Sequence, residues 1–452
     1  MQEDHFNQDF FRFLQGAPTP FHAASSMAAR LRDSGFKQLA ETDPWELAPG
    51  NSYFLIRDNG ALIAFTLAGN DYQNQGFRMM GAHTDSPSLQ IKPLAGKTSH
   101  SFFQLGVEVY GGPLLATWFD RDLSLAGRVV CTTSDGQLLT LLIDFKRPVA
   151  IIPSLAIHLD REANTGRAIN KQKDLAPIVA QISEQIANQI TAQIPTKSAL
   201  NFSSILTEQI HKEHPERKVT TIIGFDLFCY DCQPPALLGL GNEFIAAGRL
   251  DNLLSCFVGC TAMTENMSET KSNQNRLLIC NNHEEIGSLT ASGAKGSWLN
   301  TLLTRIMPDH SKRHRTLRGS FFISMDNAHG VHPNFSDKSE PEHLPLLNHG
   351  PVIKSNANQN YATTSVSAAL YKTIATEAGV ATQDFVMRSD MGCGSTIGPH
   401  IAAGLGIPAV DIGAPTLAMH SIREMTGSRD PFLLYRTINR FLSREHLPRI
   451  EG

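Results

Sequence analysis

The chain lacks the features that mark membrane, secreted and nucleic-acid-binding proteins. None of its apolar runs approaches the roughly 18 residues of a membrane span, and its seven cysteines do not form an even disulfide framework. The formal net charge is −4, so we expect no basic surface for nucleic acid or for an anionic membrane. The opening MQEDHFNQDFFRF has neither the basic region nor the apolar core of a signal peptide. These absences together predict a cytoplasmic protein with reduced thiols.

Two familiar metal motifs are also incomplete. Cys229 and Cys232 form a CxxC pair with no second pair elsewhere, which makes a zinc ribbon or a redox motif a weak interpretation. The stretch HEEIGS (283–288) departs from the HExxH zinc motif, because Gly287 stands where the second histidine belongs. The adjacent glutamates in this stretch therefore need another explanation.

A length of 452 residues favours two domains, and the first part of the chain already has regular signals. Thr19-Pro20 is predicted to start a helix that ends at Gly35, because apolar residues recur between them at helical spacing. Two apolar runs, 52–57 and 61–68, flank an Asp-Asn-Gly turn and predict a β-hairpin.

The middle of the chain, about 88–240, has a different pattern. Short strand-like pieces separated by turn residues predict an antiparallel module: VEVYGG, LLATWF, GRVVCTT and LLTLLID. Isoleucine at every fourth position predicts a long amphipathic helix over 175–194. The polar tract 196–219 matches no pattern, and we expect a mobile loop there.

From about residue 241 to 452, strands and helices alternate. The buried-strand candidates are RLLICNN, GSFFISMDN and PAVDIG, with helical patterns between them. This alternation predicts an α/β fold with a mixed β-sheet flanked by helices. That catalytic domain would be built from 1–87 and 241–452 and interrupted by the inserted, mainly antiparallel β domain at 88–240.

Several strand ends carry side chains that could bind a metal. His83 and Asp85 follow the strand FRMMGA and share one face, so Asp85 could orient His83, although such a pair is often a plain polar turn. Asp251 begins an apolar helical stretch, where a helix cap is the simpler interpretation. Glu284 and Glu285 follow a strand that looks buried, although they could also be solvated charges.

Two further candidates lie nearer the C-terminus. Asp326 ends the strand FFISM, as active-site carboxylates do in open α/β sheets, with His329 and His332 as competitors for a metal. His420 follows the strand PAVDIG, and a core or capping histidine is the commoner role for a residue in that setting.

Taken together, these side chains make a set of imidazoles and carboxylates: His83, Asp251, Glu285, Asp326 and His420. Five ligands that include one shared carboxylate suit two divalent cations about 3.5–4 Å apart. The lack of thiolate ligands favours Zn, with Co or Mn as alternatives. Glu284 is left over and would be free to act as a general base.

Nine longer motifs are specific as a set: TPFHAA, GAHTDSPSL, IPSLAIHLDRE, FIAAGRLDN, NNHEEIGS, SMDNAHGVHPN, HGPVIKSNANQNYAT, CGSTIGP and LAMHSIREM. Through them the chain resembles the aspartyl aminopeptidase family of di-zinc metallopeptidases over about residues 8–430. The resemblance implies that His83 and Asp326 bind one metal and that Glu285 and His420 bind the other. Asp251 would bridge the two metals.

The same resemblance implies further roles at this site. Asp85 would orient His83, and Glu284 would be the catalytic acid and base. The peptide bond between Asp251 and Asn252 is expected to be cis, as in the family.

Substrate choice and assembly are also implied by the resemblance alone. Lys354 aligns with a lysine that receives an acidic side chain at the first residue of the substrate, whereas a surface lysine is the plain alternative. His158 would reach the active site of a neighbouring subunit and assist at the substrate carbonyl. The inserted module at 88–240 would be a dimerisation domain, and dimers would assemble into a tetrahedral dodecamer.

The expected activity is therefore removal of an N-terminal Asp or Glu from peptides through a metal-activated water, with two Zn²⁺ per subunit. A related di-zinc amidohydrolase, either a carboxypeptidase or an N-deacylase, shares the His-x-Asp, bridging Asp and Glu-Glu pattern. A non-catalytic metal-stabilised scaffold is the third alternative.

Overall fold

The computed structural model describes residues 2–69, 71–182, 201–265 and 274–447. The chain divides into two units, and each is described by itself. The first unit comprises Met1–Ser86, Pro235–Met419 and Glu424–Gly452, and the second comprises Pro87–Pro234 and His420–Arg423. Among the described residues, no helix combines the length and the apolar character needed to cross a bilayer.

Within the described residues, a nine-stranded sheet forms the centre of the first unit. In spatial order its strands are β1 (Lys37–Gln38), β2 (Ser52–Arg57), β3 (Ala61–Thr66), β13 (Asn275–Asn281), β4 (Phe77–His83), β14 (Phe321–Met325), β18 (Ala409–Gly413), β16 (Val352–Ser355) and β17 (Gln383–Val386). Strands β13, β4, β14 and β18 run parallel, whereas β3 pairs antiparallel with β13 and β16 pairs antiparallel with β18. The predicted mixed sheet is therefore confirmed.

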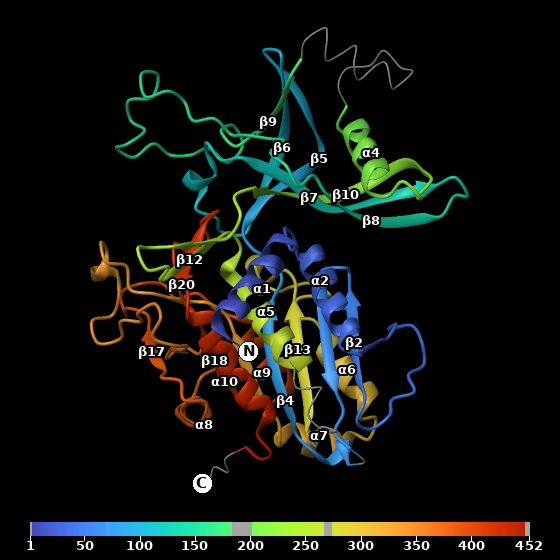
Figure 1. Cartoon of the computed structure of the whole chain (residues 1–452), viewed down its shortest axis with the longest axis vertical. Coiled ribbons are helices and arrows are strands. Elements are labelled where there is room, and N and C mark those ends of the chain that lie inside the picture. The colour runs from blue at the N-terminus through green and yellow to red at the C-terminus, as the bar shows by residue number, and fades with distance from the viewer. Residues whose placement is uncertain (1, 70, 183–200, 266–273, 448–452) are drawn as a thin grey trace. The chain divides into compact units, whose positions relative to one another are not determined.

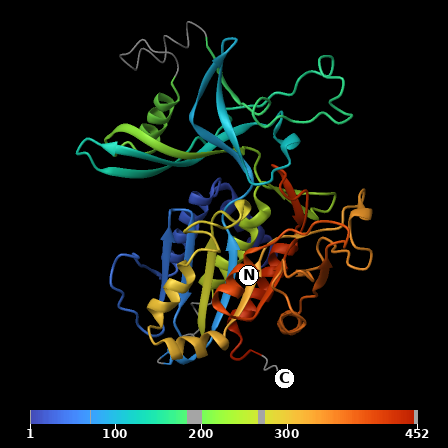
Figure 2. The same cartoon turned by 180° about the vertical axis from the view of Figure 1, so that it is seen from behind.

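The helices of the first unit cover both faces of this sheet. They are α1 (Glu3–Gln15), α2 (Pro20–Asp33), α5 (Leu250–Glu265), α6 (Trp298–Ile306), α7 (His310–Arg318), α8 (Ser365–Glu377), α9 (Ile397–Leu405) and α10 (Asp430–Ser443). Helices α1, α2, α5 and α10 pack on the face seen in Figure 1, and α6 and α7 pack on the face seen in Figure 2. The flanked sheet predicted from the alternating pattern is thus present.

Strand β13 shows how burial on both faces arises from an uninterrupted apolar run. Leu278 and Cys280 belong to the core that includes α1, α2 and α5, whereas Leu277 and Ile279 belong to the core that includes α6 and α9. Successive side chains point to opposite faces of a strand, so a strand covered on both sides needs apolar residues at every position.

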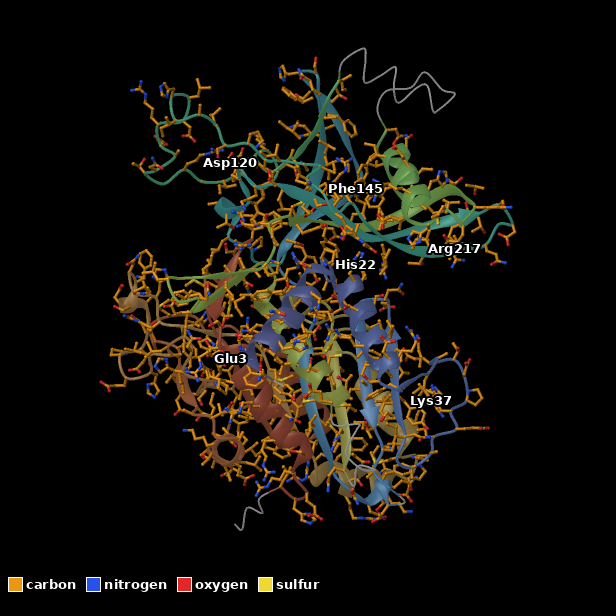
Figure 3. All side chains as sticks on the ribbon, viewed as in Figure 1. Glu3, His22, Lys37, Asp120, Phe145 and Arg217 are labelled. Carbon is orange, nitrogen blue, oxygen red and sulfur yellow. The ribbon has the colours of Figure 1, made fainter. Side chains whose placement is uncertain are left out.

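The local predictions for the N-terminal part are also confirmed. Thr19 caps α2, and its Oγ1 lies 2.8 Å from Nδ1 of His22, which Figure 3 labels. The hairpin of β2 and β3 turns through Asp58 and Asn59, whose φ angles are 50° and 58°. Asp and Asn tolerate this left-handed conformation better than other residues with a side chain.

A smaller five-stranded sheet completes the described part of the first unit. Its strands in order are β11 (Ala236–Leu238), β12 (Phe244–Ala247), β20 (Glu424–Gly427), β19 (Pro415–Leu417) and β15 (Ala328–His329). Four short 3₁₀ helices are found along the described chain: η1 (Tyr72–Asn74), η2 (Leu115–Trp118), η3 (Glu284–Ile286) and η4 (Ser336–Lys338).

The second unit contains a six-stranded antiparallel sheet among its described residues. In order, its strands are β8 (Leu138–Asp144), β7 (Leu123–Thr133), β10 (Val219–Asp231), β5 (Ser88–Ser99), β6 (Phe102–Tyr110) and β9 (Ile178–Gln181). All five neighbouring pairs are antiparallel. The predicted antiparallel character of this module is confirmed, although LLATWF folds as the 3₁₀ helix η2 rather than as a strand.

Two predictions about 175–219 were wrong where the structure describes them. The predicted helix over 175–194 contains strand β9, because Ile178 pairs with Ile151 and β9 adds to the edge of β6; its residues 183–194 lie outside the described part. The expected loop contains helix α4 (Phe202–Glu213), which ends shortly before Arg217, labelled in Figure 3. Residues 196–200 of that tract are outside the described part.

The helix α4 has a clear cause in the sequence. Asn201 caps it by accepting a hydrogen bond from the backbone N–H of Ser203. Phe202, Leu206 and Ile210 are buried at a spacing of four residues and pack into the core of the second unit. The polar residues between these positions obscured this spacing.

Candidate metal centre

The central strands of the large sheet place several candidate side chains at one edge. His83 is the last residue of β4 and pairs with Asn281, the last residue of β13. Asp326 directly follows β14, which runs parallel to β4. Because the carboxyl ends of parallel strands meet at one edge, the side chains that follow them converge.

His83 lies at the centre of a buried group of carboxylates. Only 2% of the residue is exposed, and its Nε2 lies 3.3 Å from Asp251 Oδ1 and 3.6 Å from Asp326 Oδ1. Glu284 Oε2 is 4.0 Å from the same nitrogen. Burial alone would lower the pKa of His83, but hydrogen bonding to these aspartates raises that pKa well above its usual value. One imidazole nitrogen thus faces several negative groups.

Asp85 lies beside the His83 ring and also contacts the glutamate turn. The Nδ1 atom of His83 lies 3.0 Å from the backbone oxygen of Asp85 and 3.6 Å from its carboxylate Oδ1. Both the main-chain oxygen and the carboxylate of Asp85 thus lie on the Nδ1 side of the ring. The buried carboxylate also accepts hydrogen bonds of 3.1 Å from the backbone N–H groups of Glu284 and Glu285.

The two adjacent glutamates reach the same centre because the chain turns sharply after β13. His283 and Gly287 both have left-handed φ angles, 65° and 99°, and the one-turn helix η3 lies between them. Glu284 and Glu285 each offer an oxygen within 4.8 Å of a ring nitrogen of His83 and of each other. Burial raises the pKa of Glu284 to about 7 and raises that of Glu285 well above its usual value.

Asp251 lies in the first turn of α5 rather than at a helix cap. Its backbone departs from helical geometry, and the Asp251–Asn252 peptide bond is cis, as expected from the resemblance. The residue is 4% exposed, and its carbonyl accepts a 2.6 Å hydrogen bond from Ser86 Oγ. Together with His83 and Asp326 it forms a group whose donor atoms all lie within 4.8 Å of one another.

Glu424 is a buried carboxylate beside this centre that the sequence did not single out. Its Oε2 accepts a 2.9 Å hydrogen bond from the backbone N–H of Asp251, and only 2% of the residue is exposed. Residue 424 begins β20, which pairs with β12 just ahead of α5. The signal available in the sequence was an acidic residue inside the apolar motif LAMHSIREM.

Lys354 is a buried cation at the same edge, not a surface lysine. It lies on β16, is 2% exposed, and its Nζ is 3.5 Å from Asp326 Oδ2. The ammonium also donates to the backbone oxygen of Asn327 at 3.2 Å and lies 5.2 Å from the ring centre of Tyr361.

The competing donors do not join this centre. Among the described residues, the groups of three or more donors include neither His329 nor His332. In the same part of the chain, Cys229 and Cys232 belong to no such group, and both are free thiols.

Two predicted site histidines belong to the second unit. His420 starts the segment His420–Arg423, and its Nδ1 lies 3.1 Å from the backbone oxygen of Gly112. His158 lies in an exposed turn between the exposed side chains of Ile157 and Leu159.

The donors brought together in the first unit are suited to a divalent metal. They are one imidazole and several carboxylates without any thiolate, which is the chemistry of Zn, Co or Mn sites. Buried carboxylates this close together repel one another unless a positive charge lies between them. A dication at the His83, Asp251 and Asp326 donors would supply that charge.

Comparisons with known proteins agree with this chemistry. A family described as "Aminopeptidase I zinc metalloprotease (M18)" matches residues 13–442. A "Probable M18 family aminopeptidase 2" from Stutzerimonas stutzeri is 47% identical over 445 residues, which are 98% of this chain and 100% of that protein.

Solved structures show the same similarity in three dimensions. The matching chain in "Cryo-EM structure of the Ape4 and Nbr1 complex" is 37% identical with a TM-score of 0.92, covering 98% of this chain and 86% of that one. The chain in "Structure of S. cerevesiae mApe1 dodecamer" is 28% identical with a TM-score of 0.81, covering 97% of this chain and 96% of that one.

Proposed function

The chain belongs to the M18 family of zinc metallo-aminopeptidases, and from that premise we propose that it uses two metal ions to remove Asp or Glu from peptide N-termini. Membership of this family decides against the carboxypeptidase, deacylase and scaffold alternatives. The observation that carries the proposal is the buried His83–Asp251–Asp326 donor group with the glutamate turn beside it.

The proposed metal ligands are the residues that the family resemblance assigns to the two ions. His83 and Asp326 would hold one ion, Glu285 and His420 would hold the second, and Asp251, whose Oδ1 is 3.3 Å from His83 Nε2, would contribute to both. His420 comes four residues before Glu424, whose carboxylate hydrogen-bonds the main chain of Asp251, so the connection between β19 and β20 supplies both residues.

Each side chain around the ions has a separate task in the proposed reaction. Bound zinc would polarise the scissile carbonyl and lower the pKa of an attacking water. Glu284 takes the proton of that water and returns it to the leaving amine. Its carboxylate is available because Glu285, not Glu284, is assigned to a metal. The ionised carboxylates of the metal site attract the free α-amino group of the peptide. This attraction restricts attack to the first peptide bond.

The acidic preference rests on Lys354. Its buried ammonium lies against Asp326, so a substrate side chain at this position would meet a fixed positive charge. Charge-assisted hydrogen bonds favour a carboxylate there over an apolar or basic side chain.

We also propose that the second unit is a dimerisation domain and that dimers build a dodecamer. The S. cerevesiae mApe1 named above is described as a dodecamer, and its sequence is 28% identical to that of this chain. His158 is exposed beside exposed Leu159, as a residue that reaches a neighbouring subunit must be. Analytical ultracentrifugation tests this proposal: a monomer at micromolar concentration would refute it.

The Glu284→Gln variant tests the proposed chemistry. The amide keeps the size of the side chain but cannot accept a proton, so zinc content by mass spectrometry should stay at two ions while turnover falls at least about 100-fold. Glu377→Gln is the matched control, because this partly buried glutamate pairs with Arg440 on the helical part of the same unit. Near wild-type turnover in Glu284→Gln would remove Glu284 from its assigned role.

A further inference from the structure

A cavity of about 420 Å³ lies in the first unit, and its lining includes residues of β15 and β17. We name it the methionine pocket, and six of its lining residues define it: His329, Gly330, Phe335, Phe385, Met387 and Met391. Its volume falls in the range of roughly 300–1,000 Å³ that is typical of small-molecule sites. We propose that the methionine pocket is a second substrate subsite, which receives an apolar side chain of the peptide from beyond the scissile bond. This inference rests on the proposed peptidase function.

The pocket is continuous with the side chains assigned to the first substrate residue. Phe385 on β17 is the register partner of Lys354 on the neighbouring parallel strand β16, so both side chains point to the same face of the sheet. Phe385 also shares a buried cluster with Tyr361, the ring that Lys354 contacts. Phe385 therefore lies beside Lys354 on the sheet and also lines the pocket.

The opposite wall is tied to the metal centre through the main chain. His329 comes three residues after Asp326, and its ring lies 5.8 Å from the ring of Phe385 in an edge-on arrangement. The two rings thus belong to the segment that follows Asp326 and to the strand beside Lys354. This continuity with the substrate site selects the peptide as the occupant.

The chemistry of the lining selects an apolar side chain. Phe385, Val386 and Met387 contribute apolar atoms to the lining, and methionine adapts its shape to different partners. Three charged residues line the pocket, and each has a partner: Arg388 pairs with Asp390 at 2.6 Å, Glu340 pairs with His343, and Lys338 pairs with Asp337 at 3.6 Å. A charged ligand would have to compete with these pairs.

The rim of the pocket leaves large apolar side chains in contact with solvent. Phe335 is 57% exposed and Met391 is 44% exposed. Exposed apolar groups beside a cavity are typical of a surface that a ligand covers. A peptide side chain in the pocket would bury both.

The test compares three peptides, Asp-Leu-Gly-Gly, Asp-Gly-Leu-Gly and Asp-Gly-Gly-Gly, on the zinc-loaded enzyme. We expect kcat/KM for one of the leucine peptides to exceed that for the glycine peptide by about tenfold. Cleavage of Asp-Gly-Gly-Gly by itself tests the proposed function, whereas only the ratio between peptides tests the pocket. A ratio near one for both leucine peptides would overturn this inference and leave the proposed function intact.

Two variants locate the preference in the pocket. Ser339→Trp fills the cavity from its wall, and Met391→Ala removes part of its rim; each should reduce the ratio of kcat/KM between the preferred leucine peptide and the glycine peptide to about threefold or less. Val366→Ala is the matched control, because Val366 is also 44% exposed but lies on α8 outside the pocket lining. If both variants keep the leucine preference, the pocket is not a substrate subsite. The same conclusion follows if the variants change the oligomeric state but not the leucine preference.

Discussion

Replacing Asp85 by Asn should misplace both glutamates of the centre without removing either. The Asp85 carboxylate is fully buried and accepts one hydrogen bond from each backbone N–H of Glu284 and Glu285, both at 3.1 Å. An asparagine offers one oxygen, so its NH₂ group would face the second N–H as donor against donor. The turn η3 would then lose one of the two contacts that hold it against the end of β4.

The size of the effect follows from these two hydrogen bonds. A hydrogen bond to a charged group contributes about 1.5–3 kcal/mol, and a buried N–H left without an acceptor costs about 1–3 kcal/mol. These two contributions describe in part the same lost hydrogen bond, so they are not simply added. We expect Asp85→Asn to lower the free energy of unfolding by about 2–4 kcal/mol. A shift of about 1 Å in the glutamates should lower kcat roughly 100-fold.

Asp430→Asn is the matched control for this experiment. Asp430 is 1% exposed and accepts hydrogen bonds from the backbone N–H groups of Asn348 and Gly350, at 2.7 and 3.3 Å. The same chemical change there should lower stability by a similar amount but leave kcat of the folded protein within about twofold of wild type. Urea unfolding, zinc content and kcat are measured for both variants.

The outcome that would refute the reasoning is specific. If Asp85→Asn unfolds as easily as Asp430→Asn yet keeps wild-type kcat, the carboxylate stabilises the fold without positioning the glutamates. If Asp85→Asn changes neither stability nor kcat, the two hydrogen bonds contribute neither to the free energy of unfolding nor to the positioning of the glutamates.

Three further predictions concern the ions and the first substrate residue. Lys354→Met should cut the preference for Asp over Leu at the first position by roughly 10- to 100-fold, because it removes a charge-assisted bond; an unchanged kcat/KM ratio would contradict the pocket assignment. Glu424→Ala, which removes the acceptor of the Asp251 N–H, should weaken zinc binding in a chelator competition by about tenfold, whereas Glu424→Gln keeps an acceptor and should have a smaller effect. Removal of zinc by a chelator should abolish hydrolysis while far-UV circular dichroism is preserved, and added zinc should restore activity; persistent hydrolysis would argue against metal chemistry.

Some elements were predictable because their cause is local. The helix α2 has its cap and proline next to each other in the sequence, and the β2–β3 hairpin has its turn residues between two apolar runs. Strands β4, β13 and β14 each contain a short apolar run because both faces of the sheet are covered, and those runs are also visible in the sequence.

Other elements were mispredicted because their cause is distant. Ile178 has the spacing of an amphipathic helix, but pairing with Ile151 and with β6 makes its segment a strand. Strand pairing depends on residues far along the chain, so periodicity within one segment does not reveal it. In α4 the apolar spacing was present but was hidden among polar residues.

By itself, the sequence determined which residues could take part in the centre and in what order, because imidazole and carboxylate side chains at strand ends are visible without coordinates. It also determined the resemblance that the comparisons bear out at the level of the family. Only the tertiary structure decided how the adjacent glutamates share one site: left-handed residues at 283 and 287 turn the chain, and the Asp85 carboxylate holds both peptide N–H groups. Only the fold, likewise, buried Glu424 behind Asp251 and Lys354 beside Asp326, since burial and distance arise from packing between segments far apart in the chain.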